Sequence, residues 1–321
     1  MRNKTLLVGT LVLGLITLVV LNFNKSSDEV KPVTKPLIDN EILNRPARLV
    51  IKSGGKKSTI EQLNGLWVVK ERFDLPADIE NRLLPFISSL QKTQNFGLLT
   101  SNPKRLARLN LSDTIISITG ENGKTFAAEM GKITDDALGN AMILQGETSA
   151  IRTNFTGDVE ADPAAWLNPI LYSIKPEEVK SVTFKFADGK TVFGRAAKDK
   201  KFNEQENPWL ENFVLNLATL RIIDAQGKGV TSTELAFKQS SVIIFELFDG
   251  SSITTTWAKE SNPESKDPKY FVRAQHSDPQ NKINQVGKKA EFLCPSWLME
   301  QIPTSTADLK QRLSPPTENT K

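Results

Sequence analysis

The chain opens with an uninterrupted apolar run, Leu6 to Leu21, and residues 5–24 carry no charged side chain. A helix rises about 1.5 Å per residue, so about twenty residues span the roughly 30 Å hydrocarbon core of a bilayer. No comparable run follows in the 321-residue chain. The pattern therefore predicts one transmembrane helix ahead of a polar chain that is rich in strand-like segments.

The charges that flank this run predict its orientation. Arg2 and Lys4 precede the run, and the positive-inside bias places them in the cytoplasm and the bulk of the chain in the periplasm. A cleaved signal peptide would begin similarly, but its apolar core is usually about 7–15 residues long, and Val20-Leu21-Asn22-Phe23-Asn24 offers no small-x-small cleavage site. We expect a single-pass anchor of a bacterial inner membrane over residues 1–24, in contact with lipid through residues 5–22.

Two polar segments flank the remainder of the chain. Residues 25–45 contain Pro32 and Pro36, which predicts a semi-extended linker that holds the folded part away from the membrane. Residues 304–321 contain Pro315-Pro316 and many polar positions, which predicts a disordered tail.

Between these segments the alternation of apolar and polar positions follows one plan twice, over residues 46–175 and 176–303. Each half begins with a short strand and a turn. Arg48–Ile51 precedes Gly54-Gly55, and Ser181–Phe186 precedes Asp188-Gly189.

An amphipathic helix follows in each half. Its apolar face comprises Ile79, Leu83, Phe86, Ile87 and Leu90 in the first half and Trp209, Phe213, Val214, Leu217 and Leu220 in the second. Asn207 and Pro208 suit the N-cap and first turn of the second helix. Pro85 is expected to kink or delay the first.

Each half then contains a predicted hairpin, around Asn122-Gly123 or Asp249-Gly250. Such dipeptides favour type I′ turns, which need positive φ at both central residues. Each half closes with a Trp-Leu pair, at Trp166 and at Trp297. The pattern predicts two α+β domains, each an antiparallel sheet with one packed helix. The alternative is a single continuous domain whose strands only look similar.

Composition narrows the possible chemistry. The chain has 41 basic and 37 acidic residues spread along its length, which argues against nucleic-acid binding. Cys294 is the only cysteine and has apolar neighbours, so we expect a buried structural thiol and no intramolecular disulfide.

Two motifs superficially suggest ligand binding. Gly55-Lys56-Lys57-Ser58-Thr59 lacks the GxxxxGK[ST] spacing and leads into a strand, so a hairpin turn is the better interpretation. Asp158, Glu160 and Asp162 alternate as in a calcium loop, but Pro163 and Pro169 stand where Gly and Glu are required. A helix dipole explains these carboxylates better.

The remaining candidates give no catalytic constellation. His276 is the only histidine and lies in a polar loop, and Asp135-Asp136 reads as a solvated pair. The five tryptophans are interpreted as core anchors, the alternative being a ligand-stacking pocket lined by Trp67, Trp166, Trp209 or Trp297. We therefore assign no catalytic, cofactor-binding or metal-binding residue and expect a non-enzymatic protein without a cofactor.

A succession of short motifs resembles a known family. The motifs are Gly65-Leu66-Trp67-Val68-Val69, Leu75-Pro76-Ala77-Asp78, Leu99-Thr100-Ser101-Asn102-Pro103 and Arg108-Leu109-Asn110-Leu111. They resemble a bacterial envelope family of unknown function found beside gliding-motility-type ABC transporter components. The likeness covers about residues 45–170, and the chain departs from the family's Phe-Gly-Leu landmark at Leu109-Asn110-Leu111.

The resemblance implies an anchored periplasmic α+β protein that accompanies a transporter, and it implies no active-site residue. We therefore expect an accessory or interaction subunit of an ABC-type transport system, with an inner-membrane permease or other envelope protein as partner. A tethered periplasmic ligand- or glycan-binding module is the alternative.

Overall fold

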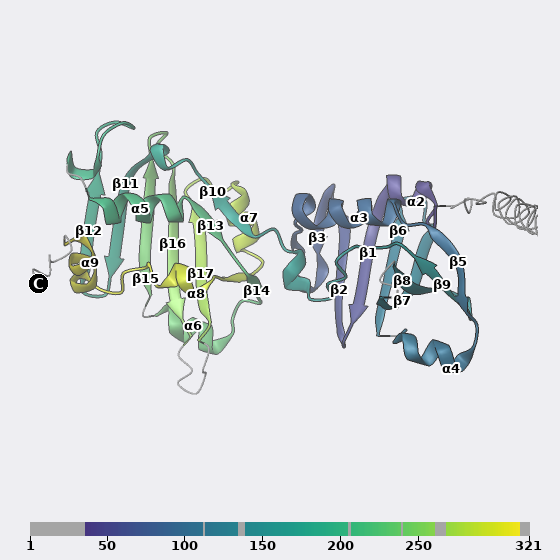
Figure 1. The fold of residues 1–321 in the computed structure, drawn as a ribbon. Helices are drawn as coiled ribbons and strands as arrows, with labels where there is room; N and C mark the ends of the chain where they lie inside the picture. Colours follow the sequence, from purple (N-terminus) through teal and green to yellow (C-terminus); the bar gives the residue numbers. More distant parts are fainter. Residues whose placement is uncertain are drawn as a thin grey trace, which may run out of the picture.

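The computed structural model describes residues 36–111, 113–133, 139–204, 207–238, 240–260 and 268–314. Two large antiparallel sheets, each packed with helices, lie side by side in an elongated molecule (Figure 1). The predicted α+β class is thus confirmed. The predicted anchor lies outside the described residues, and within the described part no helix is long and apolar enough to cross a membrane.

The first sheet has nine strands in the order β4-β3-β2-β1-β6-β7-β8-β9-β5. All neighbouring strands are antiparallel. Their bounds are β1 Pro46–Ser53, β2 Lys56–Leu63, β3 Leu66–Val69, β4 Leu75–Pro76, β5 Asn95–Thr100, β6 Thr114–Gly120, β7 Thr125–Ile133, β8 Asn140–Leu144 and β9 Ala150–Thr153. We call this sheet with its helices the first unit, residues 36–167.

The second sheet has seven antiparallel strands in the order β12-β11-β15-β16-β17-β18-β14. Their bounds are β11 Val179–Phe186, β12 Gly189–Gly194, β14 Asp224–Gln226, β15 Ser241–Leu247, β16 Ser252–Lys259, β17 Tyr270–His276 and β18 Glu291–Leu293. A separate ribbon pairs β10, Ile170–Ser173, with β13, Thr219–Arg221. Residues 170–173 thus pair with the second half of the chain, and we call residues 168–314 the second unit.

The two sheets share one strand order. Without β3 and β4, the first sheet runs β2-β1-β6-β7-β8-β9-β5, and the second runs β12-β11-β15-β16-β17-β18-β14. If the seven strands of each sheet are numbered from one to seven along the chain, both orders are 2-1-4-5-6-7-3. The third strand, β5 or β14, therefore forms one edge of each sheet and pairs with the last strand of its unit.

Each unit has a predicted helix on its core face. In the first unit a π-helical turn, Ile79–Leu83, leads into α3, Leu84–Gln91, with Pro85 in the first turn of α3. The α-helix thus begins later than its apolar face, and the delayed start that was expected of Pro85 is confirmed. The physical reason is that proline has no N–H for a hydrogen bond inside a helix. In the second unit α5, Pro208–Leu217, begins at Asn207, whose side chain accepts from Leu210 N at 3.0 Å.

Each unit also has a helix on its other face that the sequence pattern did not predict. In the first unit α4, Pro103–Leu106, and a 3₁₀ turn, Ala107–Leu109, pack leucines beside buried Ala141. In the second unit α6, Thr231–Phe237, packs Phe237 beside buried Ala258. Met142 follows Ala141 and Trp257 precedes Ala258, and both side chains lie in the main core. Successive side chains of a strand point to opposite faces of the sheet, so α4 and α6 cover the faces that are turned away from the main core.

The described part of each terminal segment was wrongly predicted, residues 36–45 as a semi-extended linker and residues 304–314 as a disordered tail. Part of the expected linker forms α2, Asn40–Asn44, which buries Ile42 and Leu43 in the first core. Part of the expected tail forms α9, Thr306–Leu313, which buries Leu309 against the second unit. In both segments a few apolar side chains are enough to order a short helix once a large core is available to receive them. Residues 25–35 and 315–321 of these predictions lie outside the described residues.

The hairpins at Asn122-Gly123 and Asp249-Gly250 are confirmed, but the predicted type I′ turn is wrong. Only the glycines have positive φ, +78° at Gly123 and +86° at Gly250. Gly123 N donates to Gly120 O and Gly250 N donates to Leu247 O, each at 3.0 Å. The turns are thus of type I followed by a left-handed glycine, the geometry of three-residue hairpin loops.

Candidate functional site

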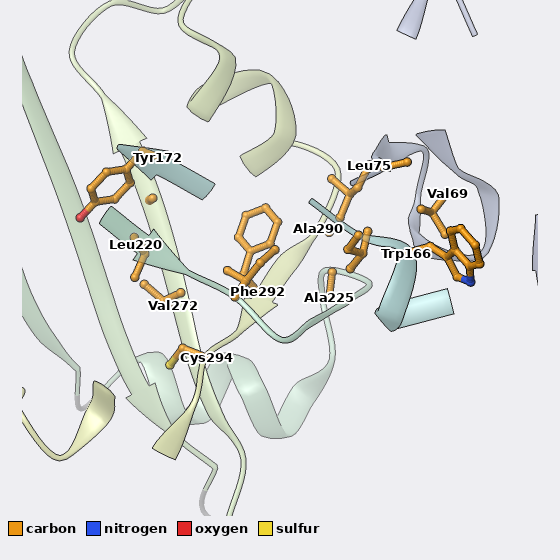
Figure 2. Close-up of a cluster of buried hydrophobic side chains, with 14 of the residues drawn as sticks. Val69, Leu75, Trp166, Tyr172, Leu220, Ala225, Val272, Ala290, Phe292 and Cys294 are labelled. Atoms are coloured by element: carbon orange, nitrogen blue, oxygen red, sulfur yellow. The ribbon is translucent and has the colours of Figure 1, made fainter. Parts of the chain in front are cut away.

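The units are joined by a continuous apolar core where the chain passes from one to the other. Asp78 N donates to Trp166 O at 2.8 Å, and Asn168 N donates to Pro76 O at 2.9 Å, so the connecting segment pairs with β4. Figure 2 shows Leu75 and Trp166 of the first unit beside Ala225 and Phe292 of the second. The two sheets therefore share one hydrophobic core.

Charged groups reinforce this junction. Arg72, on the 3₁₀ turn Lys70–Arg72, binds Asp224 of β14 through two nitrogens, at 2.5 and 3.2 Å. Arg72 also lies 3.8 Å from Asp162, which caps the 3₁₀ turn Pro163–Trp166. A hydrogen bond from Lys56 at 2.6 Å lowers the pKa of the Asp162 carboxyl below its ordinary value.

A small apolar cavity of about 130 Å³ lies at this junction. Leu75 and Pro76 line it from the first unit, and Ile222, Val286 and Phe292 line it from the second. No tryptophan contributes to its lining, so the ligand-stacking pocket considered for the space between the units is not supported. The core-anchor prediction is confirmed for Trp166 and Trp257 and wrong for Trp297, whose relative exposure is 51%.

The edge strand β5 carries exposed apolar side chains at the end of the molecule that is remote from the junction (Figure 1). Phe96 is 42% exposed and Leu98 is 67% exposed. Gly97, with φ of +101°, lies where the pairing of β5 with β9 shifts register. Basic, exposed Lys104, Arg105 and Arg108 follow on α4 and its 3₁₀ turn; we call these three residues with Phe96 and Leu98 the β5 surface.

The chain enters the described structure beside the β5 surface. Pro36 forms an antiparallel bridge with Gln94, and Leu37 N donates to Thr93 O at 3.0 Å, immediately before β5 begins. The corresponding edge strand of the second unit, β14, is occupied, because Asp224 binds Arg72 and β14 packs against the turn at Pro163–Trp166. Within the described residues, β5 pairs only with β9 and carries exposed apolar side chains, whereas β14 is covered by the first unit.

The second unit contains a larger concavity on its outer face, which we call the β17 pocket. Its volume is about 470 Å³. The walls come from β16, β17 and the connection between β17 and β18, which contains α7, Lys282–Gly287. The lining residues are Lys228, Thr254, Thr256, Arg273, Ala274, Gln275, His276, Ser277, Pro279, Asn284, Gly287, Lys288, Ala290 and Phe292.

Hydrogen bonds hold the wall at α7 in place. Asn281 caps the helix by accepting from Ile283 N at 3.0 Å. Asn284 donates to the carbonyl oxygens of His276 and Asp278 and accepts from His276 N at 2.9 Å. His276 Nδ1 accepts from Asp278 N at 3.0 Å, so a neutral imidazole carries its proton on Nε2.

Arg273 is fixed in the floor of the β17 pocket. Its guanidinium contacts the carboxylates of Glu234 and Glu291 and lies 3.9 Å from the centre of the Phe237 ring. Glu291 is fully buried, so this pairing satisfies a charge that would be costly to leave alone. Among the described residues, Lys228 and Lys288 have no such carboxylate partner.

The other sequence candidates are scattered. Gly54-Gly55 forms the β1–β2 hairpin turn, with positive φ at both glycines, as the hairpin interpretation expected. Asp158 pairs with Arg82, while Asp162 caps its turn, and no group of His, Cys, Asp and Glu in the described part of the chain is arranged for a metal. His276 lines the β17 pocket, and among the described residues no serine, threonine or cysteine side chain is hydrogen-bonded to its imidazole. Asp135-Asp136 lies outside the described residues.

Cys294 is buried, at 2% relative exposure, as predicted. Burial raises the pKa of its thiol to about 12. The thiolate is the reactive form, so this side chain is an unreactive core residue.

The β17 pocket escaped the sequence-based prediction. Thr254, Thr256 and Arg273 occupy the non-core positions of two alternating strands, a pattern that any solvated sheet face shows.

Comparison of the chain with protein-family models, curated proteins and solved structures found no match.

Proposed function

We propose that the protein is a single-pass inner-membrane protein with a periplasmic body built from two repeats of one α+β plan. In this proposal it acts as a non-enzymatic accessory subunit of an ABC-type transport system. The shared strand order, with a helix on each face of each sheet, supports the duplication. The apolar run from Leu6 to Leu21 supports the anchor, and the motif resemblance supports the type of partner.

The single observation that carries the interaction role is the exposed β5 surface beside the point where the chain enters. A fully extended chain spans at most about 3.6 Å per residue, so Pro36 lies within about 50 Å of Leu21, the end of the apolar run. In this proposal the short connection keeps the β5 surface within reach of a permease in the same bilayer. Its exposed strand edge and apolar side chains suit pairing with an extended segment of that permease.

Site-specific photocrosslinking in intact membranes tests this proposal. A photoreactive residue in place of Leu98 is expected to capture an integral permease, recovered after mild detergent extraction. The matched control is the same replacement at Leu215, which is also well exposed but lies on α5 of the second unit. Capture of lipid alone, capture of nothing, or equal capture from both positions would contradict an accessory role at this surface.

Substitution provides the second test. Phe96→Asp with Leu98→Asp is expected to abolish copurification of the permease, because two carboxylates cannot be buried in an apolar contact without a large desolvation cost. Leu215→Asp is expected to leave copurification unchanged. Retention of the chain in membranes after alkaline extraction tests the anchor separately.

The β17 pocket favours the alternative function, a tethered ligand-binding module. The two functions are compatible within one chain, because the β5 surface and the β17 pocket lie on different units.

A further inference from the structure

The β17 pocket exists because the second unit has a connection that the first unit lacks. Residues 277–290 join β17 to β18, whereas the corresponding strands β8 and β9 are joined by residues 145–149. The longer connection contains α7 and supplies a whole wall of the pocket. It is rigid, because Asn284 makes three hydrogen bonds to the backbone of its first residues and of β17.

The lining of the pocket is rich in hydrogen-bond donors and contains no carboxylate side chain. Within the described residues, the hydroxyls of Thr254 and Thr256 and the amide of Gln275 make no hydrogen bond. His276 presents Nε2 as a donor when neutral. Such groups match a ligand that carries many hydroxyl and carbonyl oxygens.

The net charge of the lining favours an anion. Arg273 contributes no net attraction, because the two carboxylates of Glu234 and Glu291, from the neighbouring α6 and β18, outnumber its single positive charge. Lys228 and Lys288 supply the uncompensated positive charge from two different loops.

We propose that the β17 pocket binds an acidic sugar, with Lys228 and Lys288 holding its anionic group and Thr254, Thr256 and Gln275 its hydroxyls. The volume of about 470 Å³ lies within the range of roughly 300–1,000 Å³ that is typical of small-molecule sites. A carboxylate of a uronic acid and a phosphate of a sugar phosphate share the required chemistry. The proposal does not depend on the membrane partner.

Calorimetric titration of the full-length protein in detergent micelles tests the proposal with four probes. These are a glucuronate-containing disaccharide, glucose 1-phosphate, inorganic phosphate and the neutral disaccharide maltose. Saturable binding of at least one acidic sugar is expected, at least about tenfold tighter than that of maltose or inorganic phosphate. Preference between the first two probes distinguishes a carboxylate from a phosphate as the recognised group.

The double variant Lys228→Ala/Lys288→Ala is expected to weaken that binding by at least about tenfold. The matched control, Lys185→Ala/Lys190→Ala, removes two lysines that are opposite each other on β11 and β12 of the same sheet, away from the pocket. This control is expected to bind as the unaltered protein does. Circular dichroism of both variants verifies that they are folded.

Three outcomes would overturn the proposal. The first is no saturable heat with either acidic sugar. The second is equal weakening in the control variant, which would show general electrostatic attraction instead of a site. The third is equal affinity for one of the two control probes. Equal affinity for inorganic phosphate would show that the sugar is not recognised, and equal affinity for maltose would show that the anionic group is not recognised.

Discussion

Arg72 and Asp224 connect the two units, with Arg72 Nε 2.5 Å from Asp224 Oδ1 and a second bond at 3.2 Å. Both side chains are largely shielded from solvent, at 22% and 30% relative exposure. Two parallel hydrogen bonds fix orientation as well as distance. This pair therefore links β14 directly to the first unit, beside the shared apolar core.

Loss of either partner is expected to destabilise the protein. Arg72→Ala and Asp224→Ala should each lower the free energy of unfolding by about 1–3 kcal/mol, because each change breaks a partly buried pair of charge-assisted hydrogen bonds. When Asp224 is removed, Arg72 keeps only the longer contact of 3.8 Å with Asp162. A double-mutant cycle in urea unfolding should give a coupling energy of about 1–2 kcal/mol. Lys124→Ala, which breaks an exposed pair with Glu41, is the control and should cause no measurable change. A coupling energy of zero between Arg72 and Asp224 would mean that the apolar core alone holds the junction.

The two tryptophans of the Trp-Leu pairs should differ sharply in their contribution to stability. Trp166→Ala is expected to cost about 3–5 kcal/mol, because the ring is buried and Nε1 donates to Glu160 O at 2.7 Å. Trp297→Ala should cost less than about 1 kcal/mol, since half of that side chain is exposed. Thermal and urea unfolding of both variants checks the contrast, and similar losses would show that Trp297 is covered in solution.

Cys294 should make stability fall at alkaline pH. Its native pKa of about 12 exceeds the ordinary value of about 8.5 that applies to the unfolded chain. Burial therefore contributes fully below about pH 8.5, and the contribution is lost as pH rises towards 12. Unfolding free energies measured between pH 7.5 and 9.5 should decline more steeply for the unaltered protein than for Cys294→Ala.

Thiol labelling gives an independent check on Cys294. A maleimide should react with it only in denaturant, because the native thiol is both buried and protonated. Rapid labelling of the native protein at pH 7.5 would refute its position in the core.

The hairpin glycines should be sensitive to substitution. Gly250→Ala is expected to lower stability by about 1 kcal/mol, because φ of +86° strains a residue with a β-carbon. Gly250→Asn should cost less, since asparagine tolerates this conformation. Gly194→Ala is the control, because its φ is not in the left-handed range and the added carbon would lie 3.9 Å from its nearest neighbour. Equal losses at Gly250 and Gly194 would argue against the turn geometry.

Much of the fold could be predicted because its signals are local. The Asn-Gly and Asp-Gly turns, the cap at Asn207 and the alternation along β11 each lie within a few residues of chain. The type of the hairpin turns could not be predicted so well. Both turn geometries accept the same dipeptides, and the length of the loop between the paired strands distinguishes them.

The features that the sequence did not predict, α2, α9 and the β17 pocket, have a common physical cause. Ile42 and Leu43 on α2 and Leu309 on α9 are a few apolar positions in otherwise polar segments, and these segments become ordered because they pack on a core formed by distant parts of the chain. The β17 pocket is similar, because Lys228, Thr254 and Lys288 are remote in the sequence and are assembled by strand pairing. No local pattern marks such a set.

The position of α9 makes the two ends of the molecule different. At the junction, β14 of the second sheet meets the β3–β4 side of the first unit, which is the side opposite β5. At the far side of the second unit, α9 lies against β12 and α5, with Thr306 bound to Asp188 and Asn207 bound to the Leu313 carbonyl. This helix therefore covers the β12 edge of the second sheet, whereas β5, at the opposite end of the molecule, carries exposed Phe96 and Leu98.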